Sequence, residues 1–177
     1  MNNDKKIALV TGSTKGIGKA IADKFEQKGF IVIRNGSSDQ QEISNYIKAD
    51  LSTDTEIKKI YEKVKVEYGK LDILVNNAAY TKYIPHDELD LLELKVIDRI
   101  INLNFKGPLI CTQVFNSLLK KSNSGLVINI ASIAGINGKG SNIAYCASKA
   151  AVINMTKSLA RALAPTRVNA ISPGYIP

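Results

Sequence analysis

A tyrosine and a lysine stand four residues apart in a segment with a helical pattern, and a serine precedes them at the end of an apolar run. Tyr145 and Lys149 would lie on one face of a helix, one turn apart. A tyrosine with the ordinary pKa of about 10 exchanges protons poorly at neutral pH, whereas a nearby ammonium favours the phenolate. Lys149 is therefore expected to lower the pKa of Tyr145. With the Ser132 hydroxyl holding a substrate oxygen, the three residues suit acid–base chemistry on a carbonyl or an alcohol.

The Tyr-x-x-x-Lys pattern is weak evidence when it stands alone, because many helices contain it by chance. The simpler interpretation of the pair is a solvated lysine beside a half-buried tyrosine. The choice between the two depends on the other motifs in the chain.

A glycine-rich loop near the amino end provides the strongest context. It runs Thr11-Gly12-Ser13-Thr14-Lys15-Gly16-Ile17-Gly18, after the apolar run 6–11 and before a helical pattern that ends at Gly29. Such a loop lets the backbone approach a pyrophosphate and aims the first N–H groups of the helix at it. A turn without a ligand is the alternative. The strand before the loop and the helix after it favour dinucleotide binding.

Several motifs, in this order, resemble those of the short-chain dehydrogenase/reductase family. The loop has the family's Gly-x-x-x-Gly-x-Gly spacing, Asn76-Asn77-Ala78-Ala79 resembles its Asn-Asn-Ala-Gly, and Ser172-Pro173-Gly174 resembles its Pro-Gly turn. The resemblance extends from about Lys6 to the last residue, and 3-oxoacyl reductases of fatty-acid synthesis are one group that it suggests. Four residues match the family's catalytic tetrad in order and spacing: Asn104, Ser132, Tyr145 and Lys149.

The resemblance implies a role for each member of the tetrad. Tyr145 would be the general acid in reduction and the general base in oxidation, and Lys149 would also bind the nicotinamide ribose. Ser132 would orient the substrate oxygen, and the main-chain carbonyl of Asn104 would hold a water of a proton relay. Pro108 supports that last role, since it has no N–H for the carbonyl four residues before it. A kink that only accommodates packing is the alternative.

The resemblance also implies which residues contact a nicotinamide dinucleotide. Those of the glycine loop would surround the phosphates, an aspartate after the third strand would contact adenine, and the Pro-Gly turn would flank the carboxamide. The expected contacts are Gly12, Ser13, Lys15, Gly16, Ile17, Gly18, Arg34, Asp50, Leu51, Asn76, Ala78, Tyr145, Lys149, Pro173, Gly174 and Ile176.

The pattern of charges favours NADP(H) over NAD(H). An acidic residue near the end of the second strand would bind the ribose 2′-hydroxyl of NAD. This chain has Arg34-Asn35-Gly36-Ser37-Ser38 at that place, without a carboxylate. Lys15 and Arg34 would instead offer cations to a 2′-phosphate. The alternative is that both are ordinary surface cations.

Strands and helices alternate along the chain, which predicts one α/β domain over residues 1–177: a Rossmann-like, doubly wound parallel sheet with helices on both faces, in three layers. The segment 35–45 is polar and has only a weak helical signal. Helices are expected after the glycine loop, at 54–68, across 89–120 with an interruption at 106–108, and at 142–164. Strands are expected at 6–11, 30–34, 47–51, 71–75, 126–131 and 167–171.

The composition is that of an ordinary soluble protein, with 45% hydrophobic and 23% charged residues. The net charge of +8 attracts anions such as nucleotide phosphates, but the lysines are spread over several helices, which argues against a nucleic-acid-binding surface. The polar amino end 1–6 and the lack of a membrane-spanning stretch predict a cytoplasmic protein. Cys111 and Cys146 are expected to be reduced and packed, and the single histidine, His86, gives no metal-ligand spacing.

The chain ends at Pro177, where the family usually continues with a substrate-covering segment and a final strand. Both are expected to be missing, which would expose a sheet edge. Two functions remain open: an oxidoreductase acting on a small ketone or secondary alcohol, and a truncated, catalytically impaired relative that binds a nucleotide or partners. A homodimer or homotetramer is expected, paired through the helices that contain Asn104 and Tyr145.

Overall fold

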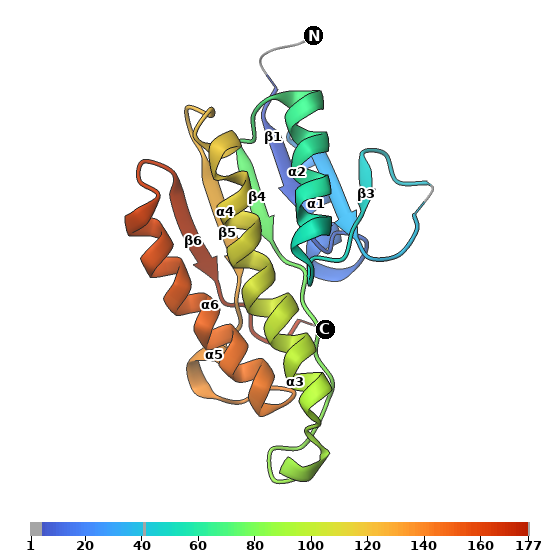
Figure 1. The fold of residues 1–177 in the computed structure, drawn as a ribbon, viewed down its shortest axis with the longest axis vertical. Helices are drawn as coiled ribbons and strands as arrows, with labels where there is room; N and C mark the ends of the chain where they lie inside the picture. The colour runs from blue at the N-terminus through green and yellow to red at the C-terminus, as the bar shows by residue number, and fades with distance from the viewer. Residues whose placement is uncertain (1–4, 41, 177) are drawn as a thin grey trace.

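A six-stranded parallel sheet forms the centre of the computed structural model, which describes residues 5–40 and 42–176 (Figure 1). The strand order β3-β2-β1-β4-β5-β6 means that the chain starts in the middle, fills one side and then the other. The predicted doubly wound sheet is confirmed. Its strands are β1 (Ile7–Val10), β2 (Ile31–Gly36), β3 (Tyr46–Lys48), β4 (Ile73–Asn76), β5 (Leu126–Ile130) and β6 (Arg167–Ile171).

Helices cover both faces of this sheet, so the predicted three layers are present (Figure 1). The helix α1 (Gly16–Gln27) covers one face, and α2 (Asp54–Tyr68), α4 (Gly107–Leu119) and α6 (Ile143–Ala162) cover the other. The remaining helical segments are η1 (Leu89–Leu91), α3 (Leu94–Ile101), the π-helical turn η2 (Asn102–Lys106) and the short α5 (Ala134–Asn137).

The apolar runs of the sequence become strands that are buried on both sides. In β1, Leu9 packs into the core under α2 and α4, whereas its neighbours Ala8 and Val10 pack into the core under α1. This alternation follows from the two-residue period of a strand, and it explains why β1 shows no polar positions. The core therefore fixes both helical layers to one sheet.

Most predicted element boundaries shift by one or two residues, and two of the predictions differ in a way that bears on the site. The third strand covers 46–48 rather than 47–51, because its partner β2 ends at Gly36, opposite Lys48. The interruption of the long helical region is a π-helical turn that begins at Asn102, six residues before Pro108, and Gly107 N–H bonds the Asn102 carbonyl across it. The predictions for α2 and β6 match the structure residue for residue.

The polar connection between β2 and β3 forms bends and turns in its described part, and residue 41 lies outside the described residues. The same holds for the terminal Pro177 and for most of the polar amino end predicted at 1–6. Over 5–40 and 42–176, no helix is long and apolar enough to cross a bilayer.

Buried amides and hydroxyls join the carboxyl ends of the neighbouring strands β4 and β5 to two helices. The Nδ2 of Asn76 donates to Asn129 Oδ1 over 2.8 Å and to Thr112 Oγ1 over 3.2 Å. In turn, Asn129 Nδ2 donates to Thr156 Oγ1 over 2.9 Å. All four side chains are buried. The network therefore links α4, β4, β5 and α6 below the edge of the sheet where the candidate site lies.

Candidate active site

The glycine loop is closed by side chains from the segment that follows β4. The Oγ1 of Thr11 accepts the N–H groups of Asn77 (2.9 Å) and Ala78 (3.0 Å), and it donates to the Val75 carbonyl. The Nδ2 of Asn77 donates back to the carbonyls of Thr11 (2.9 Å) and Gly12 (3.0 Å). These bonds fix the first crossover against the carboxyl end of β4, where doubly wound sheets bind ligands.

Two glycines are required by this close approach. A Cβ on Gly18 would lie 2.3 Å from both the Gly12 oxygen and Asn77 Nδ2, and one on Gly12 would lie 2.8 Å from Ala78 Cα. Gly12 also has a φ of +60°, in the region that side chains rarely adopt. The glycine spacing is therefore explained by backbone packing, which leaves the outer side of the loop open.

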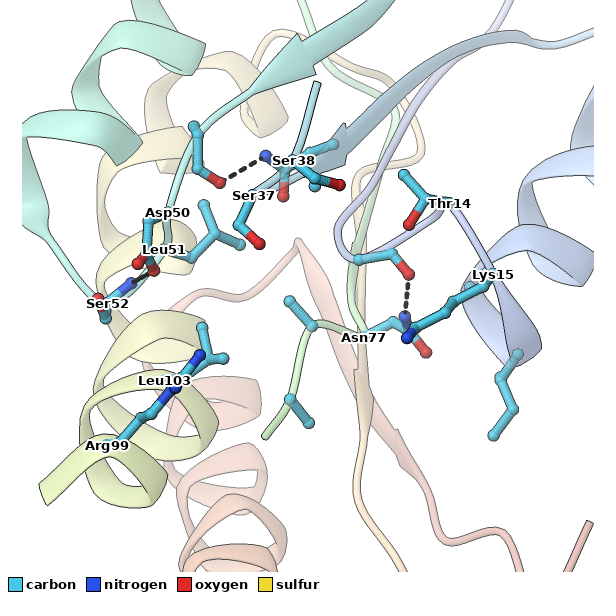
Figure 2. Close-up of a pocket in the computed structure, with 18 residues that line it drawn as sticks. Thr14, Lys15, Ser37, Ser38, Asp50, Leu51, Ser52, Asn77, Arg99 and Leu103 are labelled. Carbon is cyan, nitrogen blue, oxygen red and sulfur yellow. Dashed lines mark hydrogen bonds between the residues drawn. The ribbon is translucent and has the colours of Figure 1, made fainter. Parts of the chain in front are cut away.

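A cavity of about 430 Å³ lies on that open side, between the glycine loop and the segment after β3 (Figure 2). Figure 2 shows Thr14, Lys15 and Asn77 across the cavity from Asp50, Ser52 and Arg99. The amino end of α1 forms part of the wall, and helix amino ends favour phosphate. The cavity therefore fits the phosphates and adenosine of a dinucleotide. Of the residues predicted to contact one, Gly12, Lys15, Ile17, Gly18, Asp50, Leu51 and Ala78 line it.

Arg34 does not line this cavity, contrary to expectation. Its side chain is only 7% exposed and turns under α1, where Nη2 lies 2.6 Å from Asp23 Oδ1 and 2.9 Å from Glu26 Oε2. Burial alone would lower the pKa of Arg34, but the hydrogen bonds to Glu26 and Asp23 outweigh it and leave that pKa raised. The two carboxylates, three residues apart on α1, thus hold Arg34 inside the protein and away from a 2′-phosphate.

Three other predicted contacts are used differently. Asn76 points into the buried amide network, and its neighbour Asn77 lines the cavity instead. The hydroxyl and the N–H of Ser13 both bond the backbone of Asn35, so Ser13 fastens the loop to β2. Gly16 is exposed outside the cavity wall, with a φ of +55° where α1 begins.

Tyr145 and Lys149 occupy the first two turns of α6. Asn142 caps that helix, since its Oδ1 accepts the Tyr145 N–H over 2.8 Å. The Nζ of Lys149 donates to the carbonyl of Ile130, the last residue of β5, over 2.7 Å, and lies 5.7 Å from the centre of the Tyr145 ring. Ser132 follows Ile130 by two residues. The sequence therefore brings these three candidate residues together at the carboxyl end of β5.

The electrostatics differ from the expectation that Lys149 lowers the pKa of Tyr145. Burial raises the pKa of Tyr145, and hydrogen bonding with the Ser132 side chain acts in the opposite direction without reversing the shift. Burial also lowers the pKa of Lys149 to about 8. The reason is desolvation, which disfavours the charged form of both groups, while Lys149 binds a neutral carbonyl.

Asn104 is anchored on two sides within the π-helical turn and is 1% exposed. Its Oδ1 accepts the Tyr80 N–H over 2.8 Å, and its Nδ2 donates to the Tyr80 carbonyl over 3.0 Å and to Ser148 Oγ over 3.2 Å. The side chain of Asn104 is therefore occupied by the protein, which leaves only its main chain for the expected relay. Its bond to Ser148 brings it to the turn of α6 between Tyr145 and Lys149.

The predicted Pro-Gly turn lies beside Ser132 and not in the cavity wall. The Pro173 carbonyl accepts the N–H of Ile133, the residue after Ser132, over 3.1 Å, and a Cβ on Gly174 would contact the Ile133 side chain. Ile176 is 57% exposed. The turn therefore lies next to the segment that carries Ser132, and its contact with a carboxamide stays a prediction.

Several residues of the site carried no clear signal in the sequence. Thr11 and Asn77 close the glycine loop. The Asn76-Asn77 pair drew attention to Asn77, whereas no pattern indicated the role of Thr11. Arg99 lines the cavity, with its guanidinium carbon 4.1 Å from the centre of the Tyr80 ring. His86 bonds the Gly140 carbonyl over 3.1 Å and so joins two loops. Other lining residues outside the predicted set are Thr14, Asn35, Gly36, Ser37, Ser38, Ala49, Ser52, Ala79 and Leu103.

Comparison with known proteins agrees with the fold and motifs. The family model for short chain dehydrogenases matches residues 6–177. The 3-oxoacyl-acyl-carrier-protein reductase FabG of Thermotoga maritima is 36% identical, over 99% of this chain and 76% of that protein. An NAD-dependent glycerol dehydrogenase of Listeria innocua is 33% identical, over 99% of this chain and 72% of its own length.

Solved structures superpose closely on the same residues. The ligand-free aldohexose dehydrogenase of Thermoplasma acidophilum gives a TM-score of 0.90 at 31% identity, over 97% of this chain and 67% of that one. A short chain dehydrogenase of Leptospira borgpetersenii with bound NAD+ gives a TM-score of 0.87 at 28% identity, over 97% of this chain and 72% of that one. The chain therefore belongs to the short-chain dehydrogenase/reductase family of oxidoreductases.

Proposed function

We propose that this chain catalyses NADP(H)-dependent interconversion of a ketone and a secondary alcohol on a small-molecule substrate. The observation that carries the proposal is the position of Tyr145 and Lys149. They lie one turn apart at the start of α6, against the carboxyl end of β5 and beside Ser132. The cavity between the glycine loop and the segment after β3 opens at the same edge of the sheet, where doubly wound folds bind dinucleotides.

Different residues of the cavity suit the phosphates and the adenosine of a dinucleotide. Lys15, Ile17 and Gly18, at the amino end of α1, would hold the phosphates, and Asp50 and Leu51 would hold adenosine. When bound, the nicotinamide ring would supply or accept the hydride. The chain itself contributes position, exclusion of water and proton transfer.

Tyr145 would exchange the proton with the substrate oxygen, and Ser132 would hold that oxygen by a hydrogen bond. Because burial raises the pKa of Tyr145, the phenol stays protonated at neutral pH, which is the form that reduction of a ketone requires. Lys149 uses one N–H on the Ile130 carbonyl and keeps two for the ribose and for the proton path. The main chain of Asn104 would hold the water at the other end of that path.

The preference for NADP(H) now depends on Lys15 and not on Arg34. Lys15 lines the cavity together with Gly36, Ser37 and Ser38, a stretch without a carboxylate to bind a 2′-hydroxyl. Similar proteins include an NAD-dependent dehydrogenase and an NAD+-bound structure, so the choice is a property of each member. Dissociation constants for NADPH and NADH test it, and tighter binding of NADH contradicts it.

The activity is tested by NADPH oxidation with a panel of ketones, for the wild type and for Tyr145→Phe. Tyr145→Phe is expected to lower kcat by at least about a hundredfold, the range of a lost general acid, with NADPH binding unchanged. The matched control is Tyr61→Phe, whose hydroxyl contacts Ser117 away from the site and should not affect turnover. NADPH binding by the wild type without turnover of any ketone would favour a nucleotide-binding relative that is not an enzyme.

A further inference from the structure

A buried serine hydroxyl joins two of the three segments that carry the candidate tetrad, η2 and α6. The Oγ of Ser148 donates to the Tyr145 carbonyl over 2.7 Å and accepts Asn104 Nδ2 over 3.2 Å. Ser148 is fully buried, and it immediately precedes Lys149. Because a hydroxyl has one hydrogen, the bond to Tyr145 fixes its direction and leaves its lone pairs for Asn104.

On its other side Asn104 is bound to the chain that follows β4. It pairs with both the N–H and the carbonyl of Tyr80, at 2.8 and 3.0 Å. Three hydrogen bonds thus fix one side chain between Tyr80 and Ser148, and all of them lie in or beside a π-helical turn, a wide turn that often marks a functional site. A turn with this geometry depends on side-chain bonds to keep one position against α6.

We propose that Ser148 is a positioning residue of the reaction, which holds the π-helical turn of Asn104 at a fixed distance from Lys149. This inference rests on the proposed function. The bond crosses from η2 to α6 at the residue before Lys149, so a movement of the turn changes the separation between the Asn104 main chain and the lysine. Loss of the hydroxyl would leave a buried amide N–H unpaired and the turn free to shift. A shift of about 1 Å can cost as much as a hundredfold in rate.

The same helix offers a matched control. The Oγ1 of Thr156 donates to the Val152 carbonyl over 2.8 Å and accepts Asn129 Nδ2 over 2.9 Å. Thr156 and Ser148 are both buried on α6, and each receives an asparagine amide from another element. Thr156, however, lies two turns beyond Ser148, in the amide network of the core. Thr156→Val therefore removes an equivalent bond without touching the site.

The kinetic test compares Ser148→Ala and Thr156→Val, each alone and combined with Asn104→Ala. Ser148→Ala is expected to lower kcat roughly tenfold, with KM for NADPH within about twofold, and to have almost no further effect once Asn104 is alanine. Thr156→Val is expected to destabilise the protein while kcat stays within about twofold. A kcat for Ser148→Ala within about twofold of the wild type, or an equal loss in both backgrounds, overturns the proposal.

A second measurement does not need turnover. The Tyr80 amide donates to Asn104, so its hydrogen exchange reports whether Asn104 is held. Ser148→Ala should accelerate that exchange about tenfold, and Thr156→Val should not. If the wild type reduces no ketone, the proposed function fails, and unchanged exchange in Ser148→Ala then overturns the positioning role separately. If Ser148→Ala does not fold, Ser148→Cys, which keeps the volume but is a weaker donor, is expected to give the same changes to a smaller extent.

Discussion

The side-chain nitrogen of Lys149 lies 2.7 Å from the main-chain oxygen of Ile130, so a buried lysine of α6 is bonded to the last residue of β5. This bond fastens α6, which carries the candidate residues Tyr145 and Lys149, to the sheet. Its acceptor is a neutral carbonyl and not a carboxylate, and for this reason burial dominates and lowers the pKa of Lys149 to about 8. The position of the lysine therefore carries a cost in stability that depends on pH.

Lys149→Met should reveal that cost. In the unfolded chain the lysine pKa is about 10.4, so between pH 8 and that value the unfolded state binds more protons, and the wild type gains stability as pH rises. Below pH 8 both states are charged and the full penalty of up to about 3 kcal/mol applies. Urea unfolding should show that the wild type gains stability relative to Lys149→Met between pH 7 and pH 10. Parallel pH dependences for the two proteins would contradict a buried, destabilised ammonium.

Arg34→Met is expected to lower the free energy of unfolding by about 1–2 kcal/mol, because it leaves two carboxylates of α1 without their cation. The value is below that of a fully buried pair, since the side chains of Asp23 and Glu26 are 35% and 42% exposed. Lys48→Met is the control, as it removes an exposed pair with Asp39 and should have little effect. The ratio of NADPH to NADH affinity should not change in Arg34→Met. A change in that ratio would indicate that Arg34 contacts the cofactor after all.

Lys15→Met should weaken NADPH binding about tenfold and NADH binding less than about twofold, because only NADPH carries the 2′-phosphate that the ammonium would bind. Fluorescence titration with each cofactor measures both constants. Lys19→Met serves as the comparison, since that lysine lies one turn away and pairs with Asp23. Equal weakening of both cofactors would mean that Lys15 contacts the shared diphosphate.

Gly18→Ala should destabilise the protein by about 1–3 kcal/mol and abolish NADPH binding, because the new methyl would lie 2.3 Å from the Gly12 oxygen. Gly16→Ala separates crowding from backbone strain: Gly16 has a φ of +55° but nothing within 4 Å of a Cβ. That change should cost about 1 kcal/mol. Urea unfolding measures the loss of stability in each variant. A larger loss in Gly16→Ala than in Gly18→Ala would show that backbone dihedral strain matters more in this loop than steric crowding.

Much of the fold was predictable because its signals are local. The apolar run of β1 and the apolar face of α2 are properties of neighbouring residues, and the spacing of Tyr145 and Lys149 on one helix sets their relative position without knowledge of the rest. The doubly wound parallel sheet followed from the alternation of elements and from the family resemblance, whereas the order of its strands comes from the structure.

The remaining details depend on contacts that local patterns do not encode. Arg34 turns inward because Asp23 and Glu26, which precede it by eleven and eight residues on α1, bind its guanidinium. Neighbouring residues of a strand point to opposite faces, so a shift of one residue in the alternation decides whether Asn76 or Asn77 faces the cavity. The sign of the shift in the Tyr145 pKa requires the burial of its ring, which sequence spacing does not give.

Asn76 stands directly opposite Asn129 in the pairing of β4 with β5. If β4 slipped by one residue, Asn76 would turn to the α1 side of the sheet, where the neighbouring strands present apolar side chains such as Val10 and Ile130, and its amide would lose its bonded partner. An unpaired buried amide costs about 1–3 kcal/mol, enough to disfavour the shifted alignment. The hydrogen bond between the two asparagines thus favours the native register of β4, although both faces of the sheet are otherwise similarly hydrophobic.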